Sequence, residues 1–195
     1  VLNNANISNV LTTGKIKIDK IKPTAILTPN KMNWTNKTIP VTINMDDEGG
    51  SGIKSWRGRL SNNGGNTWNE WGGINTASNK VFNVDVEGNN VVAEIKIVDN
   101  AGNEEIVRSG VYQIDKTSPT GTFSPDSRDW AKDDIVTTFR PNDSLSGVKR
   151  WRYSISNDNG VNWKEWSTYI NGNESKDILI NTSGNNRVKV EVEDN

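Results

Sequence analysis

The sequence has 195 residues, with 24 acidic and 23 basic side chains and a formal net charge of −1. This balance gives no electrostatic reason to expect nucleic acid as a partner, and no apolar run approaches the roughly 20 residues of a membrane-spanning helix. Cysteine and histidine are absent, which excludes disulfides, thiolate and imidazole metal ligands, and catalytic Ser-His or Cys-His pairs. We therefore expect a protein that is not an enzyme, requires no organic cofactor and does not insert into a membrane.

The first 18 residues have the pattern of a strand that ends a module. Residues 1–6 align with residues 97–102 at an offset of 96 residues, and at the same offset Gly14 aligns with Gly110. We therefore predict that residues 1–18 are the last strand of a preceding module, and that the chain is an excerpt from a longer array.

Residues 19–114 are predicted to be one complete module of short strands. Residues 41–45, 81–86 and 92–98 alternate apolar and polar side chains, which is typical of half-buried strands. Trp56, Gly58 and Leu60 fall on one face of another strand. Clusters of Gly, Asn, Asp and Pro separate these segments about every ten residues, the spacing expected of a β-sandwich.

Residues 115–195 repeat that module. Residues 18–24, which contain Asp19 and Pro23, match residues 114–120 at the offset of 96, and residues 51–57 match residues 146–152 at an offset of 95. Trp151 corresponds to Trp56. The repeat stops at Asn195, so we predict an immunoglobulin-like module that lacks its final strand within this sequence.

The predicted fold class is all-β, with tandem immunoglobulin-like β-sandwich modules in an extended rod. Trp56 and Trp151 are expected to pack between the two sheets of each sandwich. The junctions contain Pro23 and Pro119, and proline stiffens the chain where one module meets the next. A junction of a few residues predicts limited rotation between neighbouring modules.

One motif in each module resembles the Asp-box hairpin, Ser-x-Asp-x-Gly-x-x-Trp, of sialidase propellers and other β proteins. Residues 156–163 match it with Asp158, Gly160 and Trp163, and residues 61–68 match it with Asn in place of Asp. The Asp side chain can accept hydrogen bonds from turn N–H groups, and Gly supplies a positive φ. The resemblance implies a structural role for these residues and for Gly65 and Trp68.

A second tryptophan follows each hairpin and is the candidate ligand-binding residue. Trp71 and Trp166 each have a glutamate beside them, Glu70 and Glu165. An exposed indole beside a carboxylate suits stacking of a sugar ring, and strand alternation would place Trp68 and Trp71 on opposite sides. The alternative is that these rings cover the edge of the core.

Oxygen-rich loops are the candidate metal sites. Asp46, Asp47 and Glu48 precede a Ser-Gly-Ile turn, and Asp143 occupies the equivalent loop of the second module. Clustered carboxylate oxygens are ligands that calcium prefers. Three carboxylates in one loop correspond to one in the other, so a solvated turn is the alternative.

Together these motifs resemble the tandem Ig-like, or fibronectin type III-like, repeats of bacterial extracellular proteins. The resemblance covers essentially all of residues 1–195 and implies a cell-surface or secreted location, or the surface of a phage particle. It implies non-catalytic spacer modules whose partners are neighbouring modules of the same chain. Two alternatives stay open: an adhesive module that binds glycan or host matrix protein through Trp71 and Trp166, and a filament subunit assembled by strand donation.

Overall fold

The computed structural model describes residues 8–195, and this part of the chain folds into strands, turns and loops without any helix. The predicted all-β sandwich class is confirmed. Because the described residues contain no helix, none of them supplies one that could cross a membrane. Residues 1–7 of the predicted leading strand lie outside the described part, and residues 9–23 contain no strand.

Residues 24–114 form the first sandwich, which has two sheets. The smaller sheet has the strand order β1-β3-β6, and the larger has the order β2-β9-β7-β4-β5 with β8 also paired to β7. The strands are β1 (Thr24–Thr28), β2 (Met32–Thr35), β3 (Ile39–Asp46), β4 (Ile53–Ser61), β5 (Asn75–Thr76), β6 (Val81–Val84), β7 (Gly88–Asp99), β8 (Glu104–Arg108) and β9 (Tyr112–Ile114).

Residues 120–194 form the second sandwich, from two three-stranded sheets. Their strand orders are β10-β11-β14 and β13-β12-β15. The strands are β10 (Thr120–Ser124), β11 (Ile135–Asn142), β12 (Val148–Ser156), β13 (Ile170–Asn171), β14 (Lys176–Ile180) and β15 (Arg187–Asp194). The smaller sheet of the first sandwich is repeated in full, because β11 lies between β10 and β14 as β3 lies between β1 and β6. In the other sheet, β13-β12-β15 repeats the pairing of β5, β4 and β7.

The first core lies between the two sheets of the first sandwich. Alternation along β3 places Ile39, Val41 and Ile43 on its buried face, and β7 supplies Ile95 and Ile97, both without exposed surface. Trp56 on β4 is buried among them, and its indole N–H donates to the Asn79 carbonyl oxygen at 2.6 Å. The ring therefore fills the core while its polar atom keeps a partner.

The second core is separate and repeats the arrangement around Trp151. This ring has no exposed surface, and its N–H donates to the Glu174 carbonyl oxygen at 3.1 Å. Phe139 on β11 packs against it with ring centroids 4.8 Å apart. The cluster is completed by Val148 and Ile178, with flanking side chains from β10, β12, β13 and β15.

The two cores divide their aromatic volume differently. In the first, Gly58 on β4 faces Phe82 on β6, and a Cβ atom at Gly58 would lie only 2.4 Å from Cε2 of Phe82. In the second, the equivalent positions are occupied by Tyr153 and Ile178. The aromatic side chain comes from β6 in the first sandwich and from β12 in the second. Each sandwich therefore has one aromatic ring at this level of its core.

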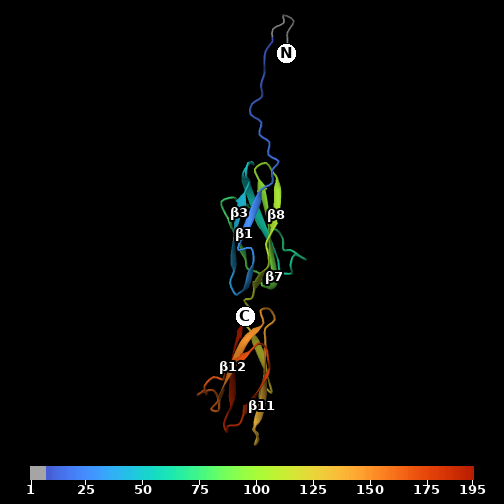
Figure 1. Cartoon of the computed structure of the whole chain (residues 1–195). Coiled ribbons are helices and arrows are strands. Elements are labelled where there is room, and N and C mark those ends of the chain that lie inside the picture. The colour runs from blue at the N-terminus through green and yellow to red at the C-terminus, as the bar shows by residue number, and fades with distance from the viewer. Residues whose placement is uncertain (1–7) are drawn as a thin grey trace.

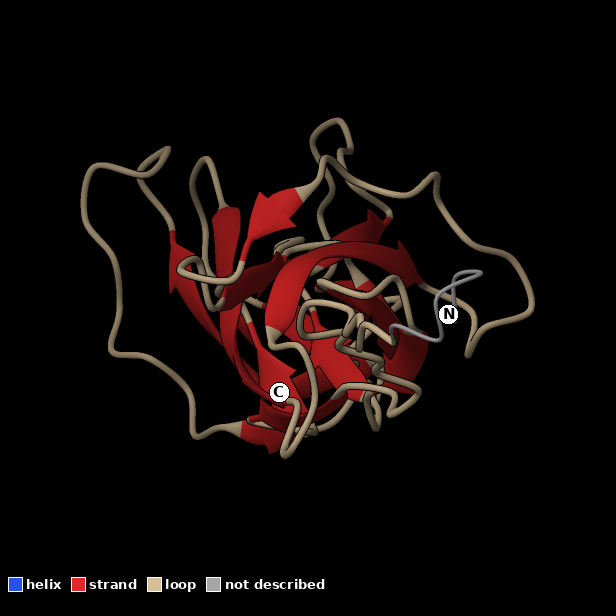
Figure 2. Ribbon diagram, turned by 90° about the horizontal axis from the view of Figure 1, so that it is seen from above, coloured by secondary structure: helices blue, strands red, loops and turns tan. Residues whose placement is uncertain are grey.

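The two sandwiches lie end to end in Figure 1, joined by residues 115–119 between β9 and β10. Residues 8–23 extend from the far end of the first sandwich, away from the second. Figure 2, seen from above, shows the strands curling around a common centre while long loops project outward.

Candidate functional site

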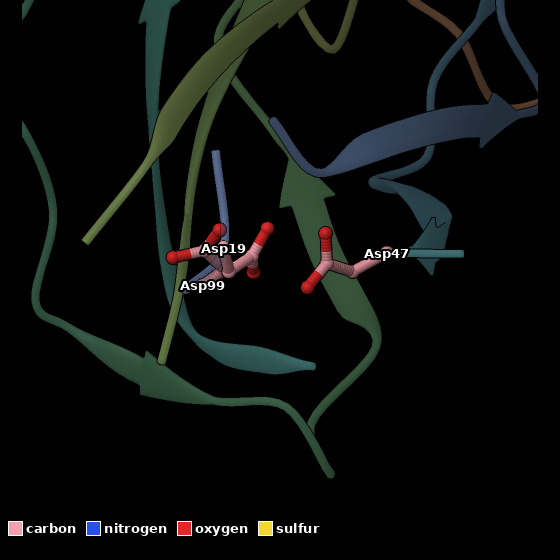
Figure 3. Close-up of side chains that lie close together, drawn as sticks. All are labelled: Asp19, Asp47 and Asp99. Carbon is pink, nitrogen blue, oxygen red and sulfur yellow. The ribbon is translucent and has the colours of Figure 1, made fainter. Parts of the chain in front are cut away.

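Three aspartates from distant parts of the first sandwich converge where residues 8–23 join it. Asp19 precedes β1, Asp47 lies between β3 and β4, and Asp99 ends β7. Figure 3 shows Asp19 and Asp99 side by side with Asp47 directed toward them. One carboxylate oxygen of each lies within 4.8 Å of the other two. We call this group the first aspartate cluster.

Turn amides hold these carboxylates in place. Asp99 is fully buried, and its Oδ1 accepts hydrogen bonds from the N–H groups of Gly102 and Asn103 at 2.6 and 2.8 Å. Asp47 Oδ2 accepts from the Gly52 N–H at 2.7 Å, whereas its Oδ1 is buried without a hydrogen-bond partner. An unpaired buried carboxylate oxygen is costly, so this atom has unused capacity to bind a cation.

Asp19 ties the incoming chain to the sandwich. Its Oδ1 accepts from the Ile21 N–H at 2.9 Å, and its Oδ2 accepts from the Ser51 N–H. The hydrogen bond from Ile21, followed by those from Ser51, lowers the pKa of Asp19 below its usual value. The residue therefore stays charged beside two other carboxylates.

The second aspartate cluster has the same construction at the junction between the sandwiches. Asp115 follows β9, Asp143 follows β11 and Asp194 ends β15, and again their oxygens lie within 4.8 Å of one another. Asp115 is buried and accepts from the N–H groups of Thr117 and Ser146 at 3.0 and 2.9 Å. The three positions are those of Asp19, Asp47 and Asp99 in the first repeat.

The second cluster is electrostatically strained. Burial raises the pKa of Asp194, and the negative charges of Asp115 and Asp143 raise it further. Burial also acts to raise the pKa of Asp115, but hydrogen bonds from Ser146 and Thr117 outweigh it, so that this pKa is lowered. Within residues 8–195, none of the seven ion pairs involves either cluster. Among the described residues, therefore, no lysine or arginine forms an ion pair that would neutralise the negative charge of either cluster.

Of the candidate metal ligands predicted from the sequence, two belong to the aspartate clusters and two do not. Asp47 and Asp143 belong to the two clusters, whereas Asp46 and Glu48 are exposed and outside both. Sequence reasoning missed Asp19, Asp99, Asp115 and Asp194 as partners. The signal was available, because only one aspartate per loop is kept between the repeats and each kept aspartate belongs to a cluster.

The Asp-box-like hairpins have matching hydrogen bonds. Asp158 Oδ1 accepts from the Asn162 N–H at 2.8 Å and from the Ser156 hydroxyl at 2.7 Å. Asn63 Oδ1 accepts the equivalent bonds in the first sandwich at 2.9 and 2.8 Å. Gly65 and Gly160 have φ values of +89° and +91°, a region that favours glycine. All these contacts are internal to the hairpins.

The tryptophans after each hairpin contact cations. The Arg59 guanidinium lies 4.7 Å from the ring centroid of Trp68 and 4.4 Å from that of Trp71, with Arg108 on Trp68 as well. The expectation that Trp68 and Trp71 face opposite sides is therefore wrong. They follow each other in a loop, where strand alternation does not apply.

The second sandwich has an equivalent stack. Lys189 contacts Trp163 and Trp166, and Arg152 contacts Trp166 and Tyr169. A cation therefore lies over a face of each of these indoles and competes with any sugar ring for that face. Glu70 and Glu165, the predicted acidic partners of a sugar, are exposed beside the rings.

Comparisons with known proteins give distant structural similarity. No family model matches the chain, and no curated protein matches it. Among solved structures, fibronectin(III)-like modules of Clostridium thermocellum CbhA have 14% identity and a TM-score of 0.33, covering 88% of this chain and 86% of that one. A structure concerning host cell surface retention of a 1.5-MDa bacterial ice-binding adhesin has 12% identity and a TM-score of 0.31, covering 89% of this chain and 64% of that one.

Proposed function

We propose that this chain is a non-catalytic structural part of a bacterial extracellular protein, in which Ig-like modules follow one another as a spacer with fixed joints. The observation that carries the proposal is the junction, residues 115–119, whose groups are bound from both sides. The Asp115 N–H donates to the Thr35 carbonyl oxygen of the first sandwich at 3.0 Å, while its carboxylate accepts from Ser146 of the second.

Neighbouring junction residues add contacts to the first sandwich. Lys116 Nζ donates to the Asp85 carbonyl oxygen at 3.1 Å, and the Thr117 hydroxyl donates to Glu87 Oε1, also at 3.1 Å. A flexible linker solvates its own backbone and side chains. Here the linker's polar groups bond to the modules instead, which supports a joint that bends little.

The aspartate clusters suggest what strengthens these joints. Each contains one residue of the incoming peptide, Asp19 or Asp115, and two residues of the sandwich that follows. A hard divalent cation such as calcium binds carboxylate and carbonyl oxygens. Bound in a cluster, it would link the incoming peptide to the sandwich and offset the repulsion at Asp194.

The alternatives receive less support. At Trp71 and Trp166, a sugar would compete for the ring face with Arg59, Arg152 and Lys189. The engaged faces favour a role in stabilising the hairpins. The extracellular setting is part of the proposal and follows from the resemblance to bacterial repeat proteins.

Calcium binding is tested by calorimetric titration and thermal unfolding of the 195-residue chain with calcium or with EGTA. We expect calcium to raise the Tm. This increase should be smaller in Asp115→Ala and unchanged in Asp133→Ala, which replaces an exposed aspartate outside both clusters. A Tm that is the same in calcium and in EGTA would refute calcium binding by the clusters.

The joint is tested separately by small-angle scattering. We expect an elongated particle, and a broader distribution of lengths when Asp115 and Glu87 are both replaced by alanine. Scattering from a compact particle, or from a freely bending pair in the unsubstituted chain, would refute the spacer function whatever the outcome with calcium.

A further inference from the structure

The loop that carries the paired tryptophans of the first sandwich lies along the edge of β4. Within residues 8–195, β5 pairs with β4 at two positions only, and residues 66–73, the first tryptophan loop, lie beside the rest of that edge. The Asn69 N–H donates to the Leu60 carbonyl oxygen at 2.9 Å. The Gly72 N–H donates to the Gly58 carbonyl oxygen at the same distance. The loop therefore takes the place of a longer β5.

The second sandwich repeats this arrangement along β12. Residues 161–168 form the second tryptophan loop, in which the Lys164 N–H donates to the Ile155 carbonyl oxygen at 2.9 Å. The Ser167 N–H donates to the Tyr153 carbonyl oxygen at 2.8 Å. These hydrogen bonds lie at the same positions of the repeat as those of the first loop. In both sandwiches the loop binds backbone groups that another strand could otherwise use.

A cation lies between the two indole rings of each loop. In the first loop the Arg59 guanidinium is 4.7 Å from one ring centroid and 4.4 Å from the other. In the second loop Lys189 Nζ is 4.4 and 4.8 Å from the two ring centroids. A cation is attracted to the face of an aromatic ring. One that contacts two rings at once therefore holds the whole loop to the sheet.

The two cations come from different strands. Arg59 on β4 lies directly opposite Glu94 on β7. At the equivalent pair of the second sandwich, Ser154 on β12 lies opposite Lys189 on β15. The Ser154 hydroxyl donates to the Lys164 carbonyl oxygen at 2.6 Å, which adds a bond to the loop. The positive charge has thus changed strands between the repeats while its place between the indoles is the same.

We propose that each tryptophan loop covers a strand edge against pairing with a second copy of this chain, and that the cation between its indoles is the latch that keeps the loop closed. Both covered strands have nine residues, which is long enough for a strand of another molecule to add. Removal of the latch lifts the loop and exposes the edge. This role goes beyond that of a spacer, because it keeps modules of similar sequence from associating edge to edge.

The first test measures how often the first loop opens, by amide hydrogen exchange of the 195-residue chain. Arg59→Ser removes the cation, so the amide protons of Asn69 and Gly72 should exchange about tenfold faster or more. Amide protons of β7 should exchange as before, which separates opening of the loop from loss of the fold. The matched control Lys54→Ser removes an exposed cation from the same strand, outside the ring contacts, and should leave all these rates unchanged.

The second test moves the latch to the other strand. Glu94→Lys with Arg59→Ser gives the first sandwich the pair of residues that the second sandwich has, and should return the exchange of Asn69 and Gly72 to the rates of the unsubstituted chain. Adding Trp71→Leu should abolish this rescue, because the cation then contacts one indole. Unchanged exchange in Arg59→Ser, or a rescue that persists without Trp71, would overturn the latch.

A conservative variant keeps the test decisive if the double exchange does not fold. Arg59→Lys retains the charge between the rings and should exchange as the unsubstituted chain does. Acceleration as large as that of Arg59→Ser would overturn the latch, and so would a folded double exchange that shows no rescue. Circular dichroism identifies the variants that are folded.

Light scattering after size exclusion tests the covered edge itself. At equal concentration Arg59→Ser should have a higher average mass than the unsubstituted chain, whose monomer mass is 21.6 kDa, and the difference should increase with concentration. Lys54→Ser should match the unsubstituted chain. A loop that opens in the exchange measurement while the mass stays that of the unsubstituted chain at every concentration would overturn the protection of the edge.

Discussion

Filling the space at Gly58 should destabilise the first sandwich, because Phe82 already occupies it. The Cβ of Gly58→Ala would lie 2.4, 2.7 and 2.9 Å from Cε2, Cδ2 and Cζ of Phe82, whereas carbon atoms in good contact are about 3.5–4.0 Å apart. The ring must therefore shift by about 1 Å. Phe82 also meets Trp56 edge-on, at 6.2 Å and 83°, so the shift disturbs the centre of the core.

The expected magnitude combines two opposing effects. Overpacking a core costs about 1–3 kcal/mol, and alanine in a strand interior recovers about 0.5–1 kcal/mol relative to glycine. We expect Gly58→Ala to lower the free energy of unfolding by about 1–2 kcal/mol. In a Phe82→Ile background, which places here the isoleucine that the second sandwich has at Ile178, the same change should be neutral or stabilising by up to about 1 kcal/mol.

Urea unfolding followed by tryptophan fluorescence and circular dichroism measures the four stabilities of this double-mutant cycle. A coupling energy of at least about 1 kcal/mol is expected. The control Gly73→Ala adds a Cβ that meets nothing within 4 Å and should change stability by less than about 0.5 kcal/mol. If Gly58→Ala stabilises the unsubstituted chain, or has the same cost in the Phe82→Ile background, the exchange of volume between the two sheets is not what shapes these cores.

Three further predictions concern charge. Hydrogen bonds from the Asn162 backbone and the Ser156 hydroxyl lower the pKa of Asp158 from 3.8 to about 2, so its contribution to stability is present above pH 3.8 and is lost as the pH falls toward 2; Asp158→Asn should flatten acid unfolding of the second sandwich in that window. Glu94 is buried between Arg59 and Arg108, and Glu94→Gln should cost about 1–3 kcal/mol in urea unfolding at pH 7, with no loss contradicting a role for the two ion pairs. Burial and the charges of Asp115 and Asp143 raise the pKa of Asp194, so Asp194→Asn should raise the Tm at pH 7 in EGTA and reduce the response to calcium, which the first aspartate cluster still supports; a lower Tm in EGTA would contradict the repulsion.

Sequence reasoning reached the fold through features that are local or repeated. Alternation along β3 and the buried positions of Trp56 and Trp151 follow from side-chain periodicity, which is visible in one short window. The Asp-box-like hairpins could also be predicted from the sequence, because their hydrogen bonds join residues a few positions apart.

Only part of the candidate site could be predicted from the sequence. Asp47 and Asp143 were selected from their loops, but Asp19 and Asp99 are separated from Asp47 by tens of residues and meet it only after both sheets have formed. Nor does periodicity describe the loop after β4, which turns Trp68 and Trp71 toward the same arginine. The exchange between Gly58 with Phe82 and Tyr153 with Ile178 depends on packing across two sheets, which no single strand reveals.

That exchange bears on how such a chain avoids misfolding. Neighbouring modules of similar sequence can trade equivalent strands while they fold, and intermodule misassembly is a characteristic failure of repeat proteins. A hybrid that brought Tyr153 against Phe82 would place two rings in room for one, and a hybrid of Gly58 with Ile178 would leave a void. Each incorrect pairing is penalised, so the two modules discriminate self from neighbour although their Asp-box-like hairpins are nearly alike.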